Sequence, residues 1–260
     1  MRTSAPVHDG LFSPFPSLHS SFEPKSGDIP LKAFLLAAGL GTRLRPLTDK
    51  IPKCLVPIRG MPMLEIWLEL CRRAGIKDVL INLHAHADTV RSALCGRDGG
   101  PQVTVAEEPE LLGSAGTLRA NRDWVASESC FWVLYADVLT NLNLAKMLSF
   151  HQEAGLKVTI GLHQVEDPTR CGVVNFDGDF VVREFVEKPA SPSGNWAFSG
   201  IMLAGPELLQ AIPSSFPTDL GFHVLPQMVG RMQGYPIAEY LLDIGTMENY
   251  RSAQETWPGL

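Results

Sequence analysis

Residues 32–53 read KAFLLAAGLGTRLRPLTDKIPK. The apolar run KAFLLAA is typical of a buried strand, and it breaks into a loop that carries Gly39 and Gly41. Glycines allow backbone amides to approach an anion closely, and successive amides in a tight turn form an anion-binding site. Arg43 and Lys53 follow and supply the positive charge that a polyphosphate needs. A strand, a glycine loop and two cations therefore predict a phosphate-binding loop.

Two common phosphate-binding motifs do not fit this loop. The Walker motif has Lys and then Ser or Thr after its last glycine, whereas Gly41 is followed by Thr42 and Arg43. The dinucleotide motif G-x-G-x-x-G fits only at its first two glycines, because Leu44 stands at the third. The whole string instead resembles the signature of the sugar nucleotidyltransferases, or NDP-sugar pyrophosphorylases. That signature reads (L-A-x-G)-x-G-T-R-L-x-P-x-T and then P-K.

The resemblance implies a transferase that condenses an NTP with a sugar 1-phosphate and releases pyrophosphate, with Mg²⁺ as cofactor. Mannose-1-phosphate guanylyltransferases and glucose-1-phosphate thymidylyltransferases belong to this family. By resemblance, Arg43 would stabilise charge on the leaving pyrophosphate, and Lys53 would hold the α-phosphate. For Arg45, a phosphate contact and an exposed solubilising role are both open. The remaining loop residues that would contact the nucleotide are Ala37, Ala38, Gly39, Gly41 and Thr42.

Two aspartates are the candidate metal ligands. Asp137 ends the apolar run 130–137, and Asp243 ends the apolar stretch before Ile-Gly-Thr. In open α/β sheets ligands bind at the carboxyl ends of strands, and Mg²⁺ prefers a few carboxylates together with substrate phosphates. Taken singly, each aspartate also fits a strand-end turn or a helix cap. Both match the metal-binding aspartates of the resembled family, which implies that Asp137 and Asp243 converge on one Mg²⁺.

The segment 107–118, EEPELLGSAGTL, is similar to the family string that holds the nucleobase. The resemblance implies that Gly113 and Gly116 bring the backbone close to the base. Glu108 occupies a position that is often Gln in thymidylyl- and uridylyltransferases. A carboxylate can accept both adjacent N–H groups of guanine, whereas uracil and thymine present one N–H between two acceptors. We therefore expect the NTP to be GTP, with UTP or dTTP as the alternative. The alternative interpretation of Glu108 is a solvated loop acid without a role in base recognition.

The tripeptide Glu187-Lys188-Pro189 follows a strand-like stretch and matches the family's sugar-phosphate site. By resemblance, Glu187 would accept hydrogen bonds from sugar hydroxyls, and Lys188 would bind the sugar phosphate. The other residues expected to line the sugar are Gly172, Ser199 and Gly200.

Alternating strand-like and helix-like segments predict an α/β fold with a doubly wound, Rossmann-like, mostly parallel sheet. After residue 157 strand patterns dominate, which predicts an inserted antiparallel subregion. We expect a helix over 220–232, a strand over 237–243 and a last helix from residue 247. The other expected strands are 32–38, 78–83, 102–108, 130–137, 157–165, 172–176, 180–187 and 196–203. The other expected helices are 63–74, 87–94, 114–125, 144–154 and 206–211.

Composition limits the classes of partner and compartment. The chain has 260 residues, of which 45% are hydrophobic and 19% charged, with a net charge of −6. Without a basic stripe or a long apolar run, we expect neither nucleic acid nor a membrane as partner. Scattered cysteines without a C-x-x-C pair indicate reduced thiols and a cytoplasmic location. A homo-oligomer such as a dimer is open.

The Ser- and Pro-rich residues 1–30 are expected to form a flexible leader, and residues 31–260 one nucleotidyltransferase catalytic domain. The C-terminal β-helix of some family members, and its acyltransferase activity, are not expected. The alternative from another class is a non-catalytic, nucleotide-sugar-binding regulatory paralogue. The presence of Lys53, Asp137 and Asp243 argues against it.

Overall fold

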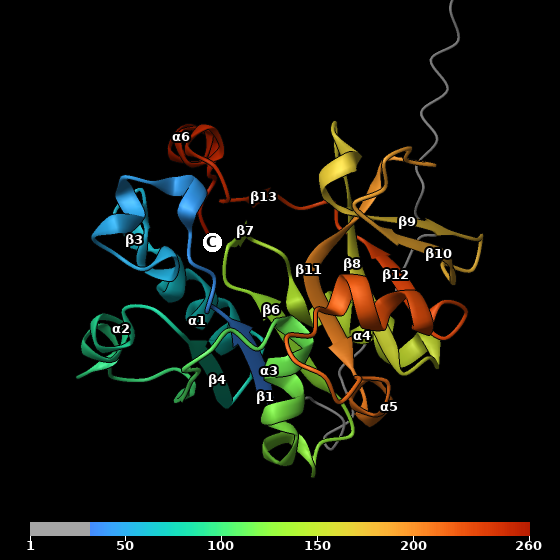
Figure 1. The fold of residues 1–260 in the computed structure, drawn as a ribbon, viewed down its shortest axis with the longest axis horizontal. Helices are drawn as coiled ribbons and strands as arrows, with labels where there is room; N and C mark the ends of the chain where they lie inside the picture. The colour runs from blue at the N-terminus through green and yellow to red at the C-terminus, as the bar shows by residue number, and fades with distance from the viewer. Residues whose placement is uncertain (1–31) are drawn as a thin grey trace, which may run out of the picture.

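The computed structural model describes residues 32–260, and a nine-stranded sheet forms its centre (Figure 1). The strand order is β10-β9-β11-β6-β1-β4-β5, with β8 paired to β11 and β12 paired to β8. Two further pairs, β2 with β3 and β7 with β13, lie outside this sheet. The sheet strands are β1 (Lys32–Leu36), β4 (Asp78–Leu83), β5 (Gln102–Glu107), β6 (Phe131–Tyr135), β8 (Val158–Gln164), β9 (Gly172–Phe176), β10 (Val182–Glu187), β11 (Trp196–Ala204) and β12 (Gln233–Pro236). The short strands are β2 (Pro57–Ile58), β3 (Met61–Pro62), β7 (Val138–Thr140) and β13 (Leu241–Asp243).

The predicted fold class is confirmed. Strands β5, β4, β1 and β6 are parallel neighbours, whereas β11 runs antiparallel to β6, β8 and β9. Residues of β1 alternate between the two faces of the sheet: Ala33 and Leu35 join one hydrophobic cluster, and Phe34 joins the other. The strand is apolar at every position after Lys32 and is therefore buried on both faces, as a central parallel strand requires.

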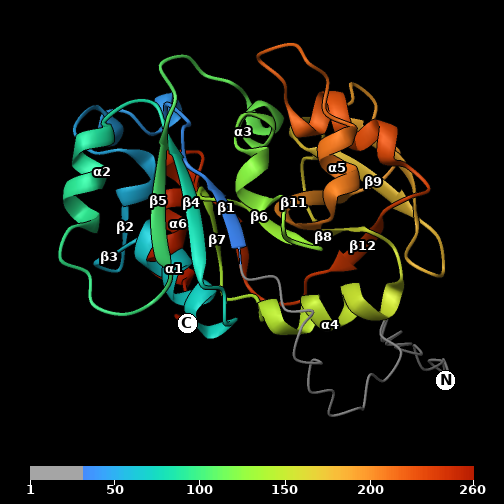
Figure 2. The same cartoon turned by 90° about the horizontal axis from the view of Figure 1, so that it is seen from below.

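The helices cover both faces of the sheet. The cluster that contains Leu35 includes residues from α1, α2, α4 and α6, and the cluster that contains Phe34 includes residues from α3 and α5. Figure 2 shows α3 and α5 on the opposite side of the sheet from α4. None of the helices in the described part of the chain is long and apolar enough to cross a membrane. The helices are α1 (Met63–Arg73), α2 (Ala87–Leu94), α3 (Ser114–Ala120), α4 (Leu144–Ala154), α5 (Pro206–Gln210) and α6 (Met247–Thr256).

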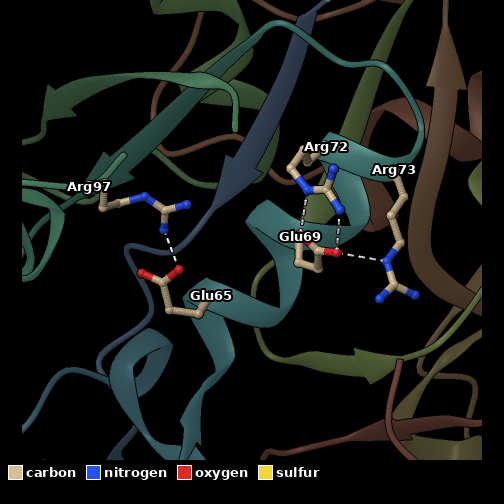
Figure 3. A network of polar contacts seen from close by, with 5 residues as sticks. All are labelled: Glu65, Glu69, Arg72, Arg73 and Arg97. Atoms are coloured by element: carbon tan, nitrogen blue, oxygen red, sulfur yellow. Dashed lines mark hydrogen bonds and ion pairs between the residues drawn. The ribbon is translucent and has the colours of Figure 1, made fainter. Parts of the chain in front are cut away.

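Helix α1 shows how sequence pattern sets both faces of an element. Its helical-period residues Leu64, Trp67 and Cys71 are buried, and Gly75 ends the helix at a φ of 77°. On the outer face, Glu69 accepts hydrogen bonds from Arg72 and Arg73, and Glu65 pairs with Arg97 (Figure 3). The two arginines lower the pKa of Glu69 to about 2. These exposed pairs are of the i,i+3 and i,i+4 kind that support a helix by a few tenths of a kcal/mol, roughly.

The helix predicted over 220–232 is wrong. The chain instead forms a π-turn over Leu220–Val224 and a 3-10 turn over Leu225–Met228. Pro226 lacks the N–H that a continuing helix needs, and Gly230 has a φ of 79°. The chain then enters β12, a strand that apolar patterning did not reveal.

Two further predictions needed correction, and a third concerns residues that the structure does not describe. The strand expected over 237–243 shrinks to β13, because only its last residues pair with β7. The helix expected over 114–125 ends at Ala120, and a separate 3-10 turn covers Arg122–Val125. The predicted flexible leader, 1–30, lies outside the described residues.

His151 gives the fold a predictable pH dependence. Its side chain in α4 is 7% exposed, Nδ1 lies 2.8 Å from Thr159 Oγ1, and burial lowers its pKa from 6.5 to about 4. As the pH falls below 6.5 the unfolded state binds this proton first, so the native state loses stability down to about pH 4. We expect this histidine to lower the free energy of unfolding by about 1.4 kcal/mol per pH unit in that window.

Urea unfolding from pH 7 to pH 4 would measure this effect. The His151→Gln variant is expected to lose part of the slope, whereas His86→Asn, at an exposed site, should keep it. Parallel stability curves for the parent protein and His151→Gln would contradict the assignment.

Candidate functional site

The glycine loop leaves β1 and turns sharply at Gly41. This residue has a φ of 63°, and a Cβ atom there would lie 2.9 Å from Thr48 Cγ2. The Gly41 carbonyl accepts hydrogen bonds from the Thr48 hydroxyl at 2.7 Å and the Leu44 N–H at 2.9 Å. Glycine is therefore required here both by backbone conformation and by space.

The loop amides divide into engaged and available groups. The Ala37 N–H donates to Asn82 Oδ1 at 2.7 Å, so this amide is not free for a phosphate. Within residues 32–260, the N–H groups of Gly39, Leu40 and Gly41 have no protein acceptor. A Cβ atom at Gly39 would meet nothing within 4 Å, so space is open beside this amide. The arrangement suits an anion outside the loop.

The cations after the loop take different positions. Lys53 Nζ lies 2.7 Å from Asp137 Oδ2, and the lysine side chain is only 11% exposed. Arg43 lies beside Gly245, and its charge partly offsets the rise that desolvation causes in the pKa of Asp243, so its guanidinium faces the same aspartates. Arg45 instead forms an exposed ion pair with Asp49 at 3.1 Å. Arg43 and Lys53 thus converge on the candidate metal ligands, and Arg45 has the solubilising position.

A short ladder brings the two aspartates together. Strand β13 pairs antiparallel with β7, Asp243 is in register with Val138, and the Ile244 N–H donates to the Asp137 carbonyl at 2.8 Å (Figure 1). Desolvation by the surrounding protein, followed by repulsion from Asp137, raises the pKa of Asp243. Two negative charges are therefore held close together opposite Lys53.

The donor set fits a hard divalent cation. Residues 32–260 offer no cluster of three or more His, Cys, Asp or Glu side chains suited to a metal, so Asp137 and Asp243 are a candidate site of two carboxylates. Mg²⁺ is commonly held by one or two carboxylates, with substrate phosphates among its remaining ligands. A pair of mutually repelling carboxylates next to a phosphate-binding loop meets that description.

Glu108 does not project into open space. It is 4% exposed, and its Oε1 accepts hydrogen bonds from Asn82 Nδ2 at 2.9 Å and from the Thr117 hydroxyl at 2.5 Å. Its Oε2 accepts from the Leu112 N–H at 3.3 Å. Because Asn82 also binds Ala37, Glu108 links the base segment to the start of the glycine loop. The carboxylate is largely occupied by protein donors, so it organises the loop rather than standing ready for a base.

The space beside the two glycines of the base segment is occupied by residues that are distant in the sequence. A Cβ atom at Gly116 would lie 2.9 Å from the Phe216 ring, and one at Gly113 would collide with the Thr218 backbone. The Thr218 carbonyl accepts the N–H groups of Ala115 and Gly116 at 2.9 and 3.0 Å. These glycines therefore allow the segment 216–221 to dock on the first turn of α3.

The sugar-phosphate candidates meet at the end of β10. Glu187 pairs with Gly172 in the β9–β10 ladder, and a Cβ atom at Gly172 would lie 2.7 Å from Glu187 Oε2. Lys188 has a φ of 49°, which removes it from the alternation of an extended strand. Its ammonium consequently lies 3.8 Å from Glu187 Oε1. Desolvation is the main cause that raises the pKa of Glu187, and Asp219 adds to it.

Ser199 and Gly200, the two residues of β11 that were predicted to line the sugar, contact different parts of the structure. Gly200, at a φ of 79°, packs on Tyr135 at the end of β6. Ser199 is buried, and its hydroxyl lies beside Gly161 of β8 and accepts from the Ile201 N–H at 3.2 Å. Ser199 is therefore not brought together with Glu187 and Lys188.

Several residues of this region escaped the sequence reasoning. Asn82 stands at the end of a predicted strand, which is the one signal that could have marked it. The charge of Arg170 partly offsets the rise that desolvation causes in the pKa of Asp243, and no sequence pattern singled out this arginine. Asp219 accepts the Ser114 hydroxyl at 2.9 Å and the Gly221 N–H at 2.8 Å, which ties the base segment to the sugar side. Phe222 follows directly, with its ring beside the Lys188 ammonium.

Comparison with known proteins gives consistent matches. The model of the family described as nucleotidyl transferase matches residues 32–258. A mannose-1-phosphate guanyltransferase of Schizosaccharomyces pombe is 33% identical over 227 residues, which cover 85% of this chain and 62% of that protein. The chain thus spans about three fifths of the length of the curated relatives it matches.

Two solved structures resemble the fold. HddC from Yersinia pseudotuberculosis complexed with GMP-PN has a TM-score of 0.72 at 26% identity, covering 87% of this chain and 99% of that chain. A putative glucose-1-phosphate thymidylyltransferase from Bacillus anthracis has a TM-score of 0.77 at 24% identity, with 86% and 94% covered. The latter likeness concerns the fold alone.

Proposed function

Because the chain belongs to the nucleotidyl transferase family, we propose that it transfers the nucleotidyl group of an NTP, preferably GTP, to a sugar 1-phosphate. The observation that carries this proposal is the ion pair between Lys53 and Asp137 at 2.7 Å. It joins the glycine loop to the aspartate pair, and thus a polyphosphate site to a metal site. Lys188 supplies a cation for the second phosphate.

The reaction needs no general base. A phosphate oxygen of the sugar 1-phosphate, already ionised at neutral pH, attacks the α-phosphorus of the NTP. The new bond joins this oxygen to the α-phosphorus, the bond from the α-phosphorus to the bridging oxygen breaks, and pyrophosphate leaves with the electron pair. The obstacle is repulsion between two anions, so catalysis comes from in-line positioning and neutralisation of charge. Arg43 and Lys53 act on the NTP, and Lys188 acts on the sugar phosphate.

Asp137 and Asp243 are the residues that would hold Mg²⁺. When bound there, the ion would neutralise charge on phosphate oxygens and orient the two substrates. Lys53 balances negative charge of the same aspartates, and its ammonium would contact the α-phosphate. The glycine loop orients the remaining phosphates through its available amides.

The preference for GTP rests on the relatives rather than on Glu108. The curated relatives are named mannose-1-phosphate guanylyltransferases, and HddC is described in complex with GMP-PN. The buried carboxylate of Glu108 is mostly occupied by Asn82 and Thr117 and does not strengthen the preference. UTP or dTTP is the alternative base, and a nucleotide-sugar-binding regulatory protein is the alternative class. We also propose a cytoplasmic location, which the absence of disulfides among the five described cysteines supports.

Pyrophosphate release tests the proposal. GTP, UTP, dTTP, ATP and CTP would each be incubated with mannose 1-phosphate, glucose 1-phosphate and a heptose 1-phosphate in the presence of Mg²⁺. We expect GTP to give the highest rate with at least one acceptor, and the Asp137→Asn variant provides the background. Release only with UTP or dTTP would overturn the base preference. Release at background from every pair, together with calorimetric binding of a nucleotide sugar, would favour the regulatory protein.

A further inference from the structure

The Lys188 ammonium has two neighbours of different chemistry. The Glu187 carboxylate lies 3.8 Å away, and the ring centroid of Phe222 lies 5.3 Å away. The lysine side chain is 54% exposed, so neither partner buries it. The left-handed backbone at Lys188 directs it toward this pair, and strained backbone of this kind concentrates at functional sites.

Phe222 is held at its backbone, and its exposed ring lies beside the Lys188 ammonium and the His223 ring. The Asp219 carboxylate accepts the N–H groups of Gly221 and Phe222 at 2.8 and 3.1 Å, and also binds the Ser114 hydroxyl. The Phe222 side chain nevertheless remains 52% exposed. Packing in the core therefore does not account for the placement of this ring, whereas contact with the ammonium does.

The two partners have opposite consequences for substrate binding. A carboxylate neutralises an ammonium and competes with an incoming phosphate for it. An aromatic face attracts a cation within about 6 Å of its centroid through the ring quadrupole, and it leaves the net positive charge intact. A ring beside the ammonium can thus hold it in place and still leave it able to bind a phosphate.

We propose that Phe222 is a positioning residue for the sugar 1-phosphate, because its ring holds the Lys188 ammonium in the orientation that receives the substrate phosphate. This inference rests on the proposed function and adds a residue to the same site. The neighbouring turn supports the role, since Glu187 Oε2 lies directly against Gly221, the residue before Phe222. Residues 219–222 therefore place the ring and confine the carboxylate.

The test compares Phe222→Leu with Phe222→Trp. Leucine keeps an apolar side chain without a ring, and tryptophan presents a stronger aromatic face. We expect Phe222→Leu to raise the Kd of mannose 1-phosphate, and the KM of the fastest acceptor, about three- to tenfold. The KM for the NTP should not change, kcat should stay within about twofold, and Phe222→Trp should match the parent protein. Met61→Ala truncates a similarly exposed apolar side chain in β3, outside the site, and should leave acceptor affinity unchanged.

A double-mutant cycle with Lys188→Met shows whether the ring acts through the lysine. We expect Phe222→Leu to have no further effect on acceptor affinity in the Lys188→Met background. Additive losses would mean that the ring contacts the sugar directly, and they would overturn the positioning role. If the parent protein and Phe222→Leu bind the acceptor equally well, the positioning role of Phe222 is wrong and the proposed function is unaffected. A parent protein that binds no sugar 1-phosphate overturns the proposed function as well.

Discussion

Replacing Lys53 with alanine is expected to lower kcat about 10²- to 10³-fold while the fold is retained. The ammonium lies 2.7 Å from Asp137 in a position that is 11% exposed, so water cannot fully replace its charge. The charge that develops on the α-phosphate during transfer would lose its nearest fixed cation. Because this stabilisation is greater in the transition state than in the ground state, kcat should fall more than KM rises.

Lys50→Ala is the matched control for this variant. Lys50 lies in the same segment, is exposed and forms no ion pair within the described residues. Pyrophosphate release by Lys50→Ala should stay within about twofold of the parent rate, as expected for an exposed substitution away from the site. Circular dichroism and thermal unfolding would verify that both variants are folded. Near-normal turnover of purified Lys53→Ala would contradict the role given to Lys53.

Replacing Asp137 with asparagine is expected to lower turnover by about 10²-fold or more. The amide has nearly the same shape, but it removes one of the two candidate metal carboxylates and the counter-charge of Lys53. We also expect the Mg²⁺ concentration that gives half-maximal activity to rise. Lys53→Ala should lower turnover without an equal rise, so Mg²⁺ titrations of the two variants distinguish the two roles.

Asp179→Asn serves as the control for the aspartate variant. Asp179 is exposed on the turn between β9 and β10, remote in sequence from both aspartates of the site. The Mg²⁺ concentration that gives half-maximal activity should be the same for Asp179→Asn as for the parent protein. For Asp243→Asn this concentration should rise, as for Asp137→Asn. If purified Asp137→Asn and Lys53→Ala both turn over at near-normal rates, the proposed nucleotidyl transfer is wrong.

Local sequence signals predicted most of the parallel half of the fold. The bounds of β4, α2 and α4 agree with the expected 78–83, 87–94 and 144–154, because their apolar periods and their flanking turn residues are unambiguous. The signals failed where tertiary contacts decide the structure. Strand β12 contains Gly234 and Pro236, and pairing with β8 rather than composition makes it a strand.

Candidate site residues could be named where one segment carries its own chemistry. The glycine loop follows β1 and Lys188 follows β10, as the sequence pattern predicted, and their substrate roles stay predictions. Glu108 could not be interpreted from its chemistry alone, because Asn82 and Thr117, which enclose it, belong to other elements. Phe222 carries no local signal either, since its proposed role depends on Lys188, which follows β10 and is distant in the sequence.

The ladder between β7 and β13 has a consequence for biosynthesis. Val138 is synthesised long before its pairing partner Asp243, which the ribosome adds well after the glycine loop. A nascent chain that has not reached Asp243 has the glycine loop and Asp137, but it has neither the second carboxylate nor Gly245, the residue beside Arg43. On the proposed function, such a translation intermediate lacks one of the two carboxylates that would hold Mg²⁺. We therefore expect transfer to begin only after β13 has paired with β7.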